Sequence, residues 1–259
     1  MGDVLTEIPP PSRFFQEDLS NFTPPVPLIP SPFLVFSNPK PEEPLRPSLL
    51  IIAISRPSLH LFHHVTAKTL VGSLILPEIP FSGNSVEPSL GDKSCNIYSI
   101  NDAASLVLLV SVQCPIAAER SHMVAKLLIG EKIIPERVLI LDSIQSKSFR
   151  GKLSPDETYA YKLETSCERK ALADGCRDPV LLKDLEYFPS GSVVDGLAAA
   201  LLARCEIKHI KGTLSVSWPE HGPSVVAMVK SLLHTKMLPG LDTSQYGDQE
   251  DKYQQRLYT

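Results

Sequence analysis

The sequence lacks several patterns that would assign the protein to a familiar class. Its 259 residues hold no apolar run of the roughly 18 residues that a membrane-spanning helix needs. The opening residues MGDVLTEIPP show neither the basic region nor the apolar run of a secretory signal. The 25 Lys and Arg residues are scattered, and the formal net charge is -4, so no basic patch predicts nucleic-acid binding. We expect a soluble protein of the cytoplasm, with the nucleus as a further compartment, that binds neither membrane nor nucleic acid.

Cysteine is scarce, and its spacing excludes two kinds of site. The chain has five cysteines: Cys95, Cys114, Cys167, Cys176 and Cys205. Their number is odd and no two form a C-x-x-C pair, which fits neither a disulfide framework nor a zinc site. We therefore expect reduced and mostly buried thiols, and neither a metal nor a cofactor.

Motifs of the common enzyme classes are also missing. The sequence contains neither of the phosphate-binding loops G-x-G-x-x-G and G-x-x-x-x-G-K-[ST]. It also lacks the G-x-S-x-G turn that exposes a nucleophilic serine. No combination of residues predicts catalysis, and we expect a protein that is not an enzyme.

Single residues leave weaker alternatives open. His60 and His64, with His63 between them, could share a helix face and hold a metal, but no acid lies near them in sequence. A solvated helix face is therefore the favoured interpretation. Asp142 follows a buried strand, where α/β enzymes place functional groups, although a helix cap or a turn explains it equally well.

Two further positions lie at predicted helix starts. Cys114 precedes Pro115 and a helix, whose N-terminus would lower the pKa of a thiol, but a small buried hydrophobic residue is the favoured interpretation. The negative charge of Asp195 interacts favourably with the dipole of the helix that it opens, and Gly196 would allow close approach of a backbone. A structural role explains both residues.

The chain divides into three segments by composition. Residues 1–47 hold twelve of the 24 prolines, a density that blocks helices and central strands and predicts an extended or disordered arm. Its apolar patches at 14–15 and 33–36 could still lie across the folded body or a partner. Residues 48–240 are predicted to form the folded domain. Residues 241–259 are polar and predict a flexible tail with an apolar tip.

The domain shows strands that alternate with helices. Continuously apolar runs at 49–54, 106–110 and 138–141 predict strands that are buried on both faces of a sheet. Between the last two runs, Pro115 opens a helical pattern that ends near Gly130. This strand–helix–strand unit is typical of a parallel sheet.

The second half of the domain extends the same pattern. An apolar stripe at helical spacing over residues 194–205 predicts a helix that Ser192 can cap. Apolar and polar residues alternate over 210–218, which predicts a strand with one face exposed to solvent. A last helix is predicted to start at Pro223. Residues 77–94 and 145–158 are predicted to be loops. The fold class is therefore a layered α/β domain with a mostly parallel sheet flanked by helices.

The sequence resembles the proteasome assembly chaperones. The resemblance is carried by VVDGLAAALLARCEIKHIKGTLSVSW over residues 193–218, by the helix and Leu-Pro-Gly-Leu run that follow, and by the closing Leu257-Tyr258-Thr259. It implies a heterodimer with proteasome assembly chaperone 2 that binds the proteasome α subunits and precursor particles. The pair would promote assembly of the α-ring of the core particle.

The resemblance also implies a role for the last three residues, which match a hydrophobic-Tyr-any motif. The carboxylate of Thr259 would pair with a lysine in a pocket between α subunits, Tyr258 would bury its ring and donate a hydrogen bond, and Leu257 would fill an apolar shelf. Two alternatives are an α/β enzyme of hydrolase-like or phosphorylase-like fold and a proteasome regulator that uses the same tail.

Overall fold

The computed structural model describes residues 30–37, 43–65, 67–80, 82–85, 89–102, 105–154, 156–173, 182 and 185–234. The chain divides into two compact units, Met1–Pro30 and Ser31–Thr259, and the elements described here belong to the second. The predicted tail at 241–259, with Leu257, Tyr258 and Thr259, lies outside the described residues. The same holds for most of the predicted arm, so both stay predictions.

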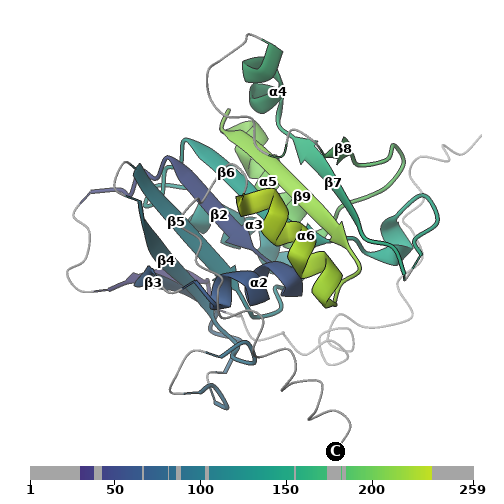
Figure 1. Cartoon of the computed structure of the whole chain (residues 1–259). Helices are drawn as coiled ribbons and strands as arrows, with labels where there is room; N and C mark the ends of the chain where they lie inside the picture. The colour runs from purple at the N-terminus through teal and green to yellow at the C-terminus, as the bar shows by residue number, and fades with distance from the viewer. Residues whose placement is uncertain are drawn as a thin grey trace, which may run out of the picture. The chain divides into compact units, whose positions relative to one another are not determined.

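Nine strands within the described residues form one sheet with the order β1-β3-β4-β5-β2-β6-β9-β7-β8 (Figure 1). The strands are β1 Phe33–Phe36, β2 Leu49–Ala53, β3 Lys68–Ile75, β4 Cys95–Asp102, β5 Ser105–Val112, β6 Arg137–Ser143, β7 Tyr159–Glu164, β8 Glu186–Tyr187 and β9 Lys211–Trp218. Strands β5, β2, β6 and β9 run parallel at the centre, while β1, β3 and β4 on one side and β7 on the other pair antiparallel. The sheet is therefore parallel where it is most deeply buried and mixed overall.

Helices cover both faces of the sheet. The described helices are α2 Arg56–His63, α3 Ala118–Leu128, α4 Ser166–Ala173, α5 Gly196–Ile207 and α6 Pro223–His234, with a short 3-10 turn η2 at Ser146–Ser148. Helices α3 and α5 pack on one face, and α2 and α6 pack on the other. This arrangement confirms the predicted layered α/β class. None of the helices in the described part of the chain has the length and apolar character needed to cross a membrane.

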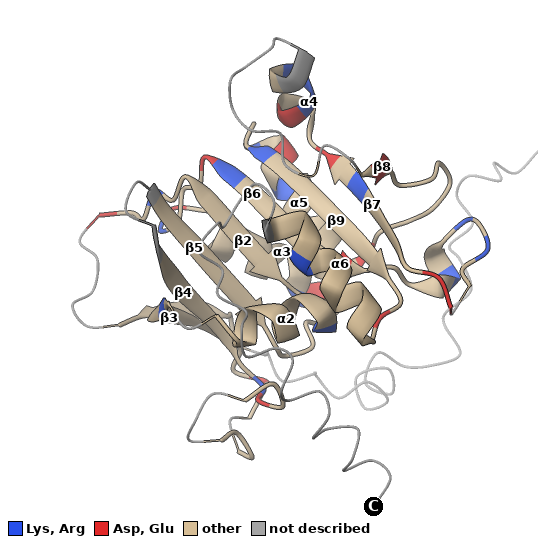
Figure 2. Cartoon of the chain, in the orientation of Figure 1, with Lys and Arg blue, Asp and Glu red and all other residues tan. Residues whose placement is uncertain are grey.

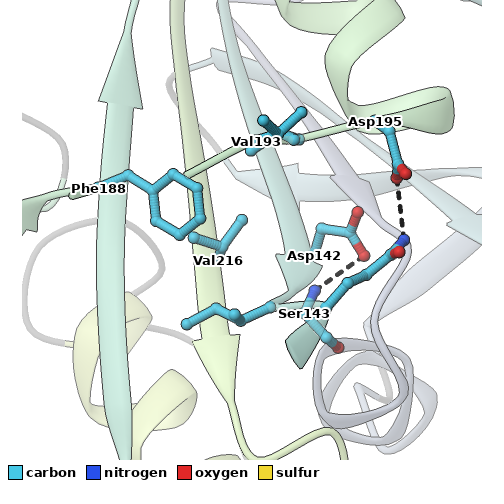
Figure 3. Close-up of a pocket in the computed structure, with 9 residues that line it drawn as sticks. Asp142, Ser143, Phe188, Val193, Asp195 and Val216 are labelled. Atoms are coloured by element: carbon cyan, nitrogen blue, oxygen red, sulfur yellow. Dashed lines mark hydrogen bonds between the residues drawn. The ribbon is translucent and has the colours of Figure 1, made fainter. Parts of the chain in front are cut away.

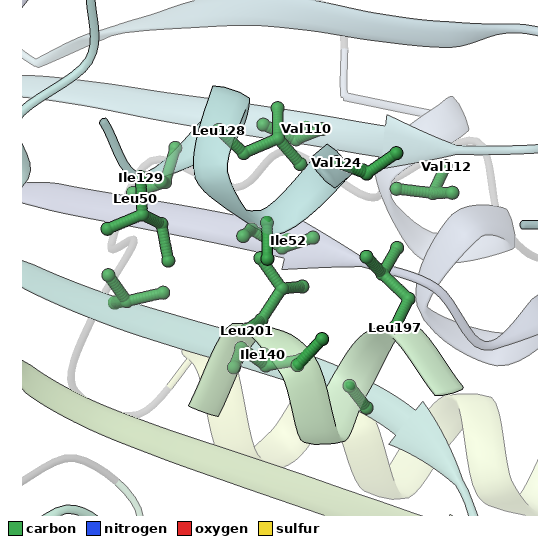
Figure 4. Close-up of a cluster of buried hydrophobic side chains, with 14 of the residues drawn as sticks. Leu50, Ile52, Val110, Val112, Val124, Leu128, Ile129, Ile140, Leu197 and Leu201 are labelled. Atoms are coloured by element: carbon green, nitrogen blue, oxygen red, sulfur yellow. The ribbon is translucent and has the colours of Figure 1, made fainter. Parts of the chain in front are cut away.

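The core sits on both faces because the central strands alternate their side chains. In β2, Leu50 and Ile52 face helices α3 and α5, whereas Ile51 and Ala53 face α2 and α6. Figure 4 shows the first of these layers, in which Leu201 of α5 lies near the β2 side chains. Strands β2 and β5 carry no charged side chain (Figure 2), which is why the sequence predicts them as continuous apolar runs.

Strand β9 differs from its prediction. The sequence predicts one wet face, but Thr213, Ser215 and Ser217 are buried along with Leu214 and Val216. The physical reason is that β9 lies between β6 and β7 and is covered by α5 on one face and α6 on the other. Small hydroxyl side chains tolerate this burial when they find hydrogen-bond partners, and the Ser217 hydroxyl donates to the Asp142 carbonyl at 3.4 Å.

Two helix starts also differ from their predictions. Helix α3 begins at Ala118 and not at Pro115. Helix α5 begins at Gly196, and its N-cap is Asp195, so Ser192 is not the cap. The Ser192 hydroxyl instead accepts a hydrogen bond from the Arg150 amide at 2.8 Å. This bond connects the loop before α5 to the loop that contains Arg150.

The apolar patch at 33–36 forms edge strand β1. It pairs antiparallel with β3 and buries Leu34, while Phe33 and Val35 remain about half exposed. Its close approach to β3 depends on Gly72, because a Cβ at that position would lie 2.5 Å from the Val35 carbonyl oxygen. Residues before the predicted boundary at 48 thus contribute to the sheet.

Candidate functional site

An open groove runs along the carboxyl-terminal edge of the parallel strands. Its volume is about 1040 Å³. The groove is lined by residues from the segments 54–60, 90–93, 112–116, 142–145, 195–197 and 221–226. These segments are the connections that follow β2, β5, β6 and β9, together with the loop before β4 and the start of α5. Four strand ends and the starts of helices α2, α5 and α6 therefore meet at one site.

The topology of the sheet explains the position of the groove. Strands β2 and β5 are neighbours, but the helix after β2 packs on one face and the helix after β5 packs on the other. Such a reversal leaves a crevice outside the carboxyl ends of the two strands, which is where open α/β sheets bind ligands. The groove is therefore the candidate binding site of this protein.

Asp142 is one of the two carboxylates that line the groove. It is the second-last residue of β6, and the Ser143 amide donates a hydrogen bond to its Oδ1 at 2.8 Å (Figure 3). Burial raises the pKa of Asp142 to about 6, against the effect of that hydrogen bond. The negative charges of Asp195 and Glu220 raise it further. Asp142 is thus a carboxyl group that changes charge close to neutral pH.

A small cavity lies beside Asp142. Phe188, Val193 and Val216 supply apolar walls, and the Gln145 amide donates to Asp195 Oδ1 at 2.9 Å (Figure 3). The cavity volume is about 10 Å³, which is enough for at most about one water molecule. This cavity is therefore too small for an organic ligand, whereas the large groove has room for one.

Cys114 lines the groove but does not have the properties of a nucleophile. It is buried, and burial raises the pKa of its thiol to about 11. It also lies four residues before Ala118, the first residue of α3, so the helix N-terminus does not stabilise a thiolate there. The interpretation of Cys114 as a small buried hydrophobic residue fits these observations.

The histidine cluster lies on α2 and at its end. The rings of His60 and His64 are 5.1 Å apart, and those of His63 and His64 are 5.3 Å apart. Burial, together with the nearby Lys68, lowers the pKa of His63, and burial with the nearby His60 lowers that of His64. Within the described part of the chain, no three His, Cys, Asp or Glu side chains come together as a metal site would require. Of the three, only His60 lines the groove.

The fold brings together residues that the sequence singled out separately. Asp142, Cys114, His60, Asp195 and Gly196 all line the groove, although they come from four different connections. The site was not predicted as a whole, because each residue had a structural explanation of its own.

Sequence reasoning missed the cationic residues of the groove. Arg56 lies two residues after the predicted strand at 49–54, and this position could have identified it. Lys93 precedes β4, a strand that no continuous apolar run in the sequence predicts. The position of Lys93 in the groove depends on the pairing of β4 with β5. No local pattern could have placed Lys93 in the groove.

No protein-family model matches the chain, and no curated protein matches it significantly. Solved structures share its fold. Pyrococcus furiosus PbaA, an archaeal homolog of proteasome-assembly chaperone, is 14% identical with a TM-score of 0.59, and the match covers 88% of this chain and 92% of PbaA. Pyrococcus furiosus PbaB, an archaeal proteasome activator, is 13% identical with a TM-score of 0.56, covering 88% of this chain and 99% of PbaB.

A protein of unknown function from Thermoplasma acidophilum also has this fold. It is 12% identical with a TM-score of 0.54, and the match covers 85% of this chain and 93% of the other. At these identities the likeness shows a common fold over nearly the whole of each chain. It confirms the predicted fold class and leaves the function to be argued separately.

Proposed function

We propose that this protein is a proteasome assembly chaperone that acts by binding and not by catalysis. The observation that carries the proposal is the fold it shares with PbaA over 88% of the chain, because PbaA is an archaeal homolog of proteasome-assembly chaperone. The sequence resemblance over residues 193–218 supports the same family and favours proteasome assembly chaperone 1 as the counterpart. In the structure these residues form helix α5 and strand β9, which belong to the core.

The proposal includes a partner and a location. The protein would form a heterodimer with proteasome assembly chaperone 2, bind proteasome α subunits and precursor particles, and promote assembly of the α-ring. It would act in the cytoplasm and the nucleus. The sequence resemblance supports these steps, and a role in binding requires no catalytic group, metal or cofactor.

The proposed anchor is the end of the chain. Leu257, Tyr258 and Thr259 would dock into a pocket between two α subunits. An apolar side chain, a tyrosine and a free carboxylate provide three distinct contacts, of which the carboxylate is the strongest if it meets a lysine. Specificity for immature particles would come from the larger surface of the folded domain.

A regulator of the finished proteasome is the second candidate. The observation in its favour is that PbaB, an archaeal proteasome activator, shares the fold with a TM-score of 0.56. The same C-terminal tail would serve both functions. The two candidates differ in whether they bind precursor particles or finished ones.

The enzyme alternative is weaker. Asp142, Cys114 and His60 do line one groove, as an enzyme of this fold would require. The raised pKa of Cys114, however, leaves the thiol protonated at neutral pH and opposes nucleophilic catalysis. We therefore do not propose a reaction.

Capture of proteasome subunits tests the chaperone proposal. The intact chain is coexpressed with proteasome assembly chaperone 2 and used to capture free α subunits, precursor particles and finished particles. Two variants accompany it: Tyr258→Ala, and an added glycine after Thr259 that moves the carboxylate while keeping all three side chains. We expect the intact chain to capture precursors and both variants to capture several-fold less, with the heterodimer unchanged.

Other outcomes separate the candidates. Preferential capture of finished particles, with faster peptide hydrolysis by them, would favour the regulator. Failure of the intact heterodimer to capture any α subunit would overturn both proteasome proposals. Equal capture by all three forms would retain the chaperone and remove the tail as its anchor.

A further inference from the structure

The groove is long enough for an extended ligand. Across its edge the sheet order runs from β4 through β5, β2 and β6 to β9. Neighbouring strands lie about 4.8 Å apart, so the four spacings cover about 19 Å. An extended chain advances about 3.3 Å per residue, so this length corresponds to about six residues of peptide. The volume of about 1040 Å³ is at the upper end for small-molecule pockets.

The charges of the groove are divided along this length. Lys93 precedes β4 and Arg56 follows β2, so the two cationic side chains belong to the half formed by β4, β5 and β2. Asp142 in β6 and Asp195 at the start of α5 supply the anionic half. The charge of Glu220, which follows β9, also acts on Asp142. The groove therefore has a positive half and a negative half.

These charges lack ion partners in the described part of the chain. The ion pairs found there join other residues, and none includes Arg56, Lys93, Asp142 or Asp195. Arg56 also begins α2, whose first turn has no acidic residue, so its charge is opposite to the one a helix N-terminus favours. Like charges gathered in each half repel each other and are stabilised by a ligand of the opposite charge.

Apolar side chains also line the groove. Ile54 follows β2, Val112 ends β5 and Ile116 follows it, while Leu197 and Val226 come from the first turns of α5 and α6. Side chains of this kind favour apolar groups on a ligand, whereas a purely ionic ligand would leave them in contact with water.

From this arrangement we infer that the groove binds an extended peptide segment with an acidic group at one end, a basic group at the other and apolar side chains between them. The acidic group lies against Arg56 and Lys93, and the basic group lies against Asp142 and Asp195. A ligand with one kind of charge would be repelled by half of the groove. The inference does not depend on the proposed proteasome function, because it rests on residues of the groove and not on Leu257, Tyr258 and Thr259.

Synthetic peptides test this site directly. The probes are Glu-Leu-Ser-Leu-Val-Lys and its reverse sequence, both capped at their ends so that only the side chains are charged. A control probe of the same length has glutamine at both ends. Binding to the full chain is measured by isothermal titration calorimetry at low salt. We expect one bipolar probe to bind with a stoichiometry of one and about tenfold more tightly than the glutamine probe.

Variants of the groove identify the halves. Arg56→Gln and Asp142→Asn should each weaken binding of the bipolar probe by about three- to tenfold and leave the glutamine probe unchanged. Lys93→Gln is a second test of the positive half on an exposed side chain. The matched controls are Lys126→Gln and Glu136→Gln, which make the same charge changes on exposed residues outside the groove and should have no effect.

A charge reversal gives the sharpest result. The double variant Arg56→Glu/Lys93→Glu should prefer a probe with lysine at both ends, because both halves of the groove are then negative. Equal affinity for bipolar and glutamine probes would overturn the inference, as would an affinity that the groove variants do not change. Absence of binding by every probe at millimolar concentration would also overturn it.

Discussion

Glu168 on α4 forms a buried ion pair with Arg137 on β6, with 3.2 Å between Glu168 Oε1 and Arg137 Nη2. The Glu168 side chain is only 1% exposed and that of Arg137 is 12% exposed. The two residues belong to elements that are far apart in sequence. Burial raises the pKa of Glu168, while the charges of Arg137 and Lys211 oppose this shift. The pair therefore fixes α4 against the end of the sheet.

Loss of one partner should destabilise the fold more than loss of both. Arg137→Met removes the main cation beside a buried carboxylate, and we expect the free energy of unfolding to fall by about 3 kcal/mol. The double variant Arg137→Met/Glu168→Leu replaces the pair by apolar groups and should lie within about 1 kcal/mol of the wild type. Urea denaturation measures both. Equal losses in the single and double variants would show that the pair is not coupled.

The carboxyl group of Asp142 should make stability depend on pH. Its folded pKa of about 6 exceeds the ordinary value of 3.8, so the folded state holds a proton that the unfolded state has lost between these values. Stability from this group is therefore present at acidic pH and is lost as the pH rises from about 4 to about 6. The loss is at most about 3 kcal/mol.

The variant Asp142→Asn isolates this effect. An asparagine keeps an oxygen that can accept the hydrogen bond from Ser143 and removes the charge. The difference in unfolding free energy between variant and wild type, measured in urea at several pH values, should grow in favour of the variant up to about pH 6. A difference that stays constant from pH 4 to pH 7 would contradict the raised pKa.

Gly72 should be required for the edge strand. A Cβ at this position would meet the Val35 carbonyl oxygen, so Gly72→Ala should push β1 from β3 and lower the unfolding free energy by about 1 to 3 kcal/mol. The Ser37 amide donates to the Val71 carbonyl at 2.7 Å, and faster hydrogen exchange of this amide would report the separation. Gly91→Ala is the control, because the nearest atom there is 3.8 Å away. An unchanged exchange rate of the Ser37 amide would mean that β1 and β3 accommodate the added methyl group without separating.

The Cys114 thiol should react slowly. A pKa of about 11 in place of the ordinary 9.0 lowers the thiolate fraction at pH 7.5 by about a hundredfold, and burial limits access further. Alkylation by iodoacetamide, followed by mass spectrometry, should therefore label Cys114 at least about a hundred times more slowly in the folded protein than in urea. Rapid labelling of the folded protein would revive the enzyme alternative.

Local sequence pattern predicted the strands that are buried on both faces. The runs at 49–54, 106–110 and 138–141 correspond to β2, β5 and β6, because burial between two helix layers demands apolar residues at every position. Strands β3 and β4 were missed. They lie toward the edge and mix polar with apolar residues, as in KTLVGSLI over β3, so no continuous apolar run marks them.

The functional residues were predicted singly and not as a site. Asp142 is singled out because it follows a buried strand, Cys114 because it precedes a predicted helix, and Asp195 because it opens one. Whether these residues lie close together depends on which strands pair. Strand order is set by contacts between distant parts of the chain. The groove with its two charged halves could therefore not be predicted from any local pattern.

The sequence by itself determined the layered α/β class and the core strands, because side-chain hydrophobicity and its period act locally along the chain. It also contains the Leu257-Tyr258-Thr259 motif on which the proposed proteasome docking rests. Only the tertiary structure decided that Lys93 and Arg56 share a groove with Asp142. The physical reason is that backbone hydrogen bonding between strands brings together residues distant in sequence, and the charges acquire a common function only once they are close in space.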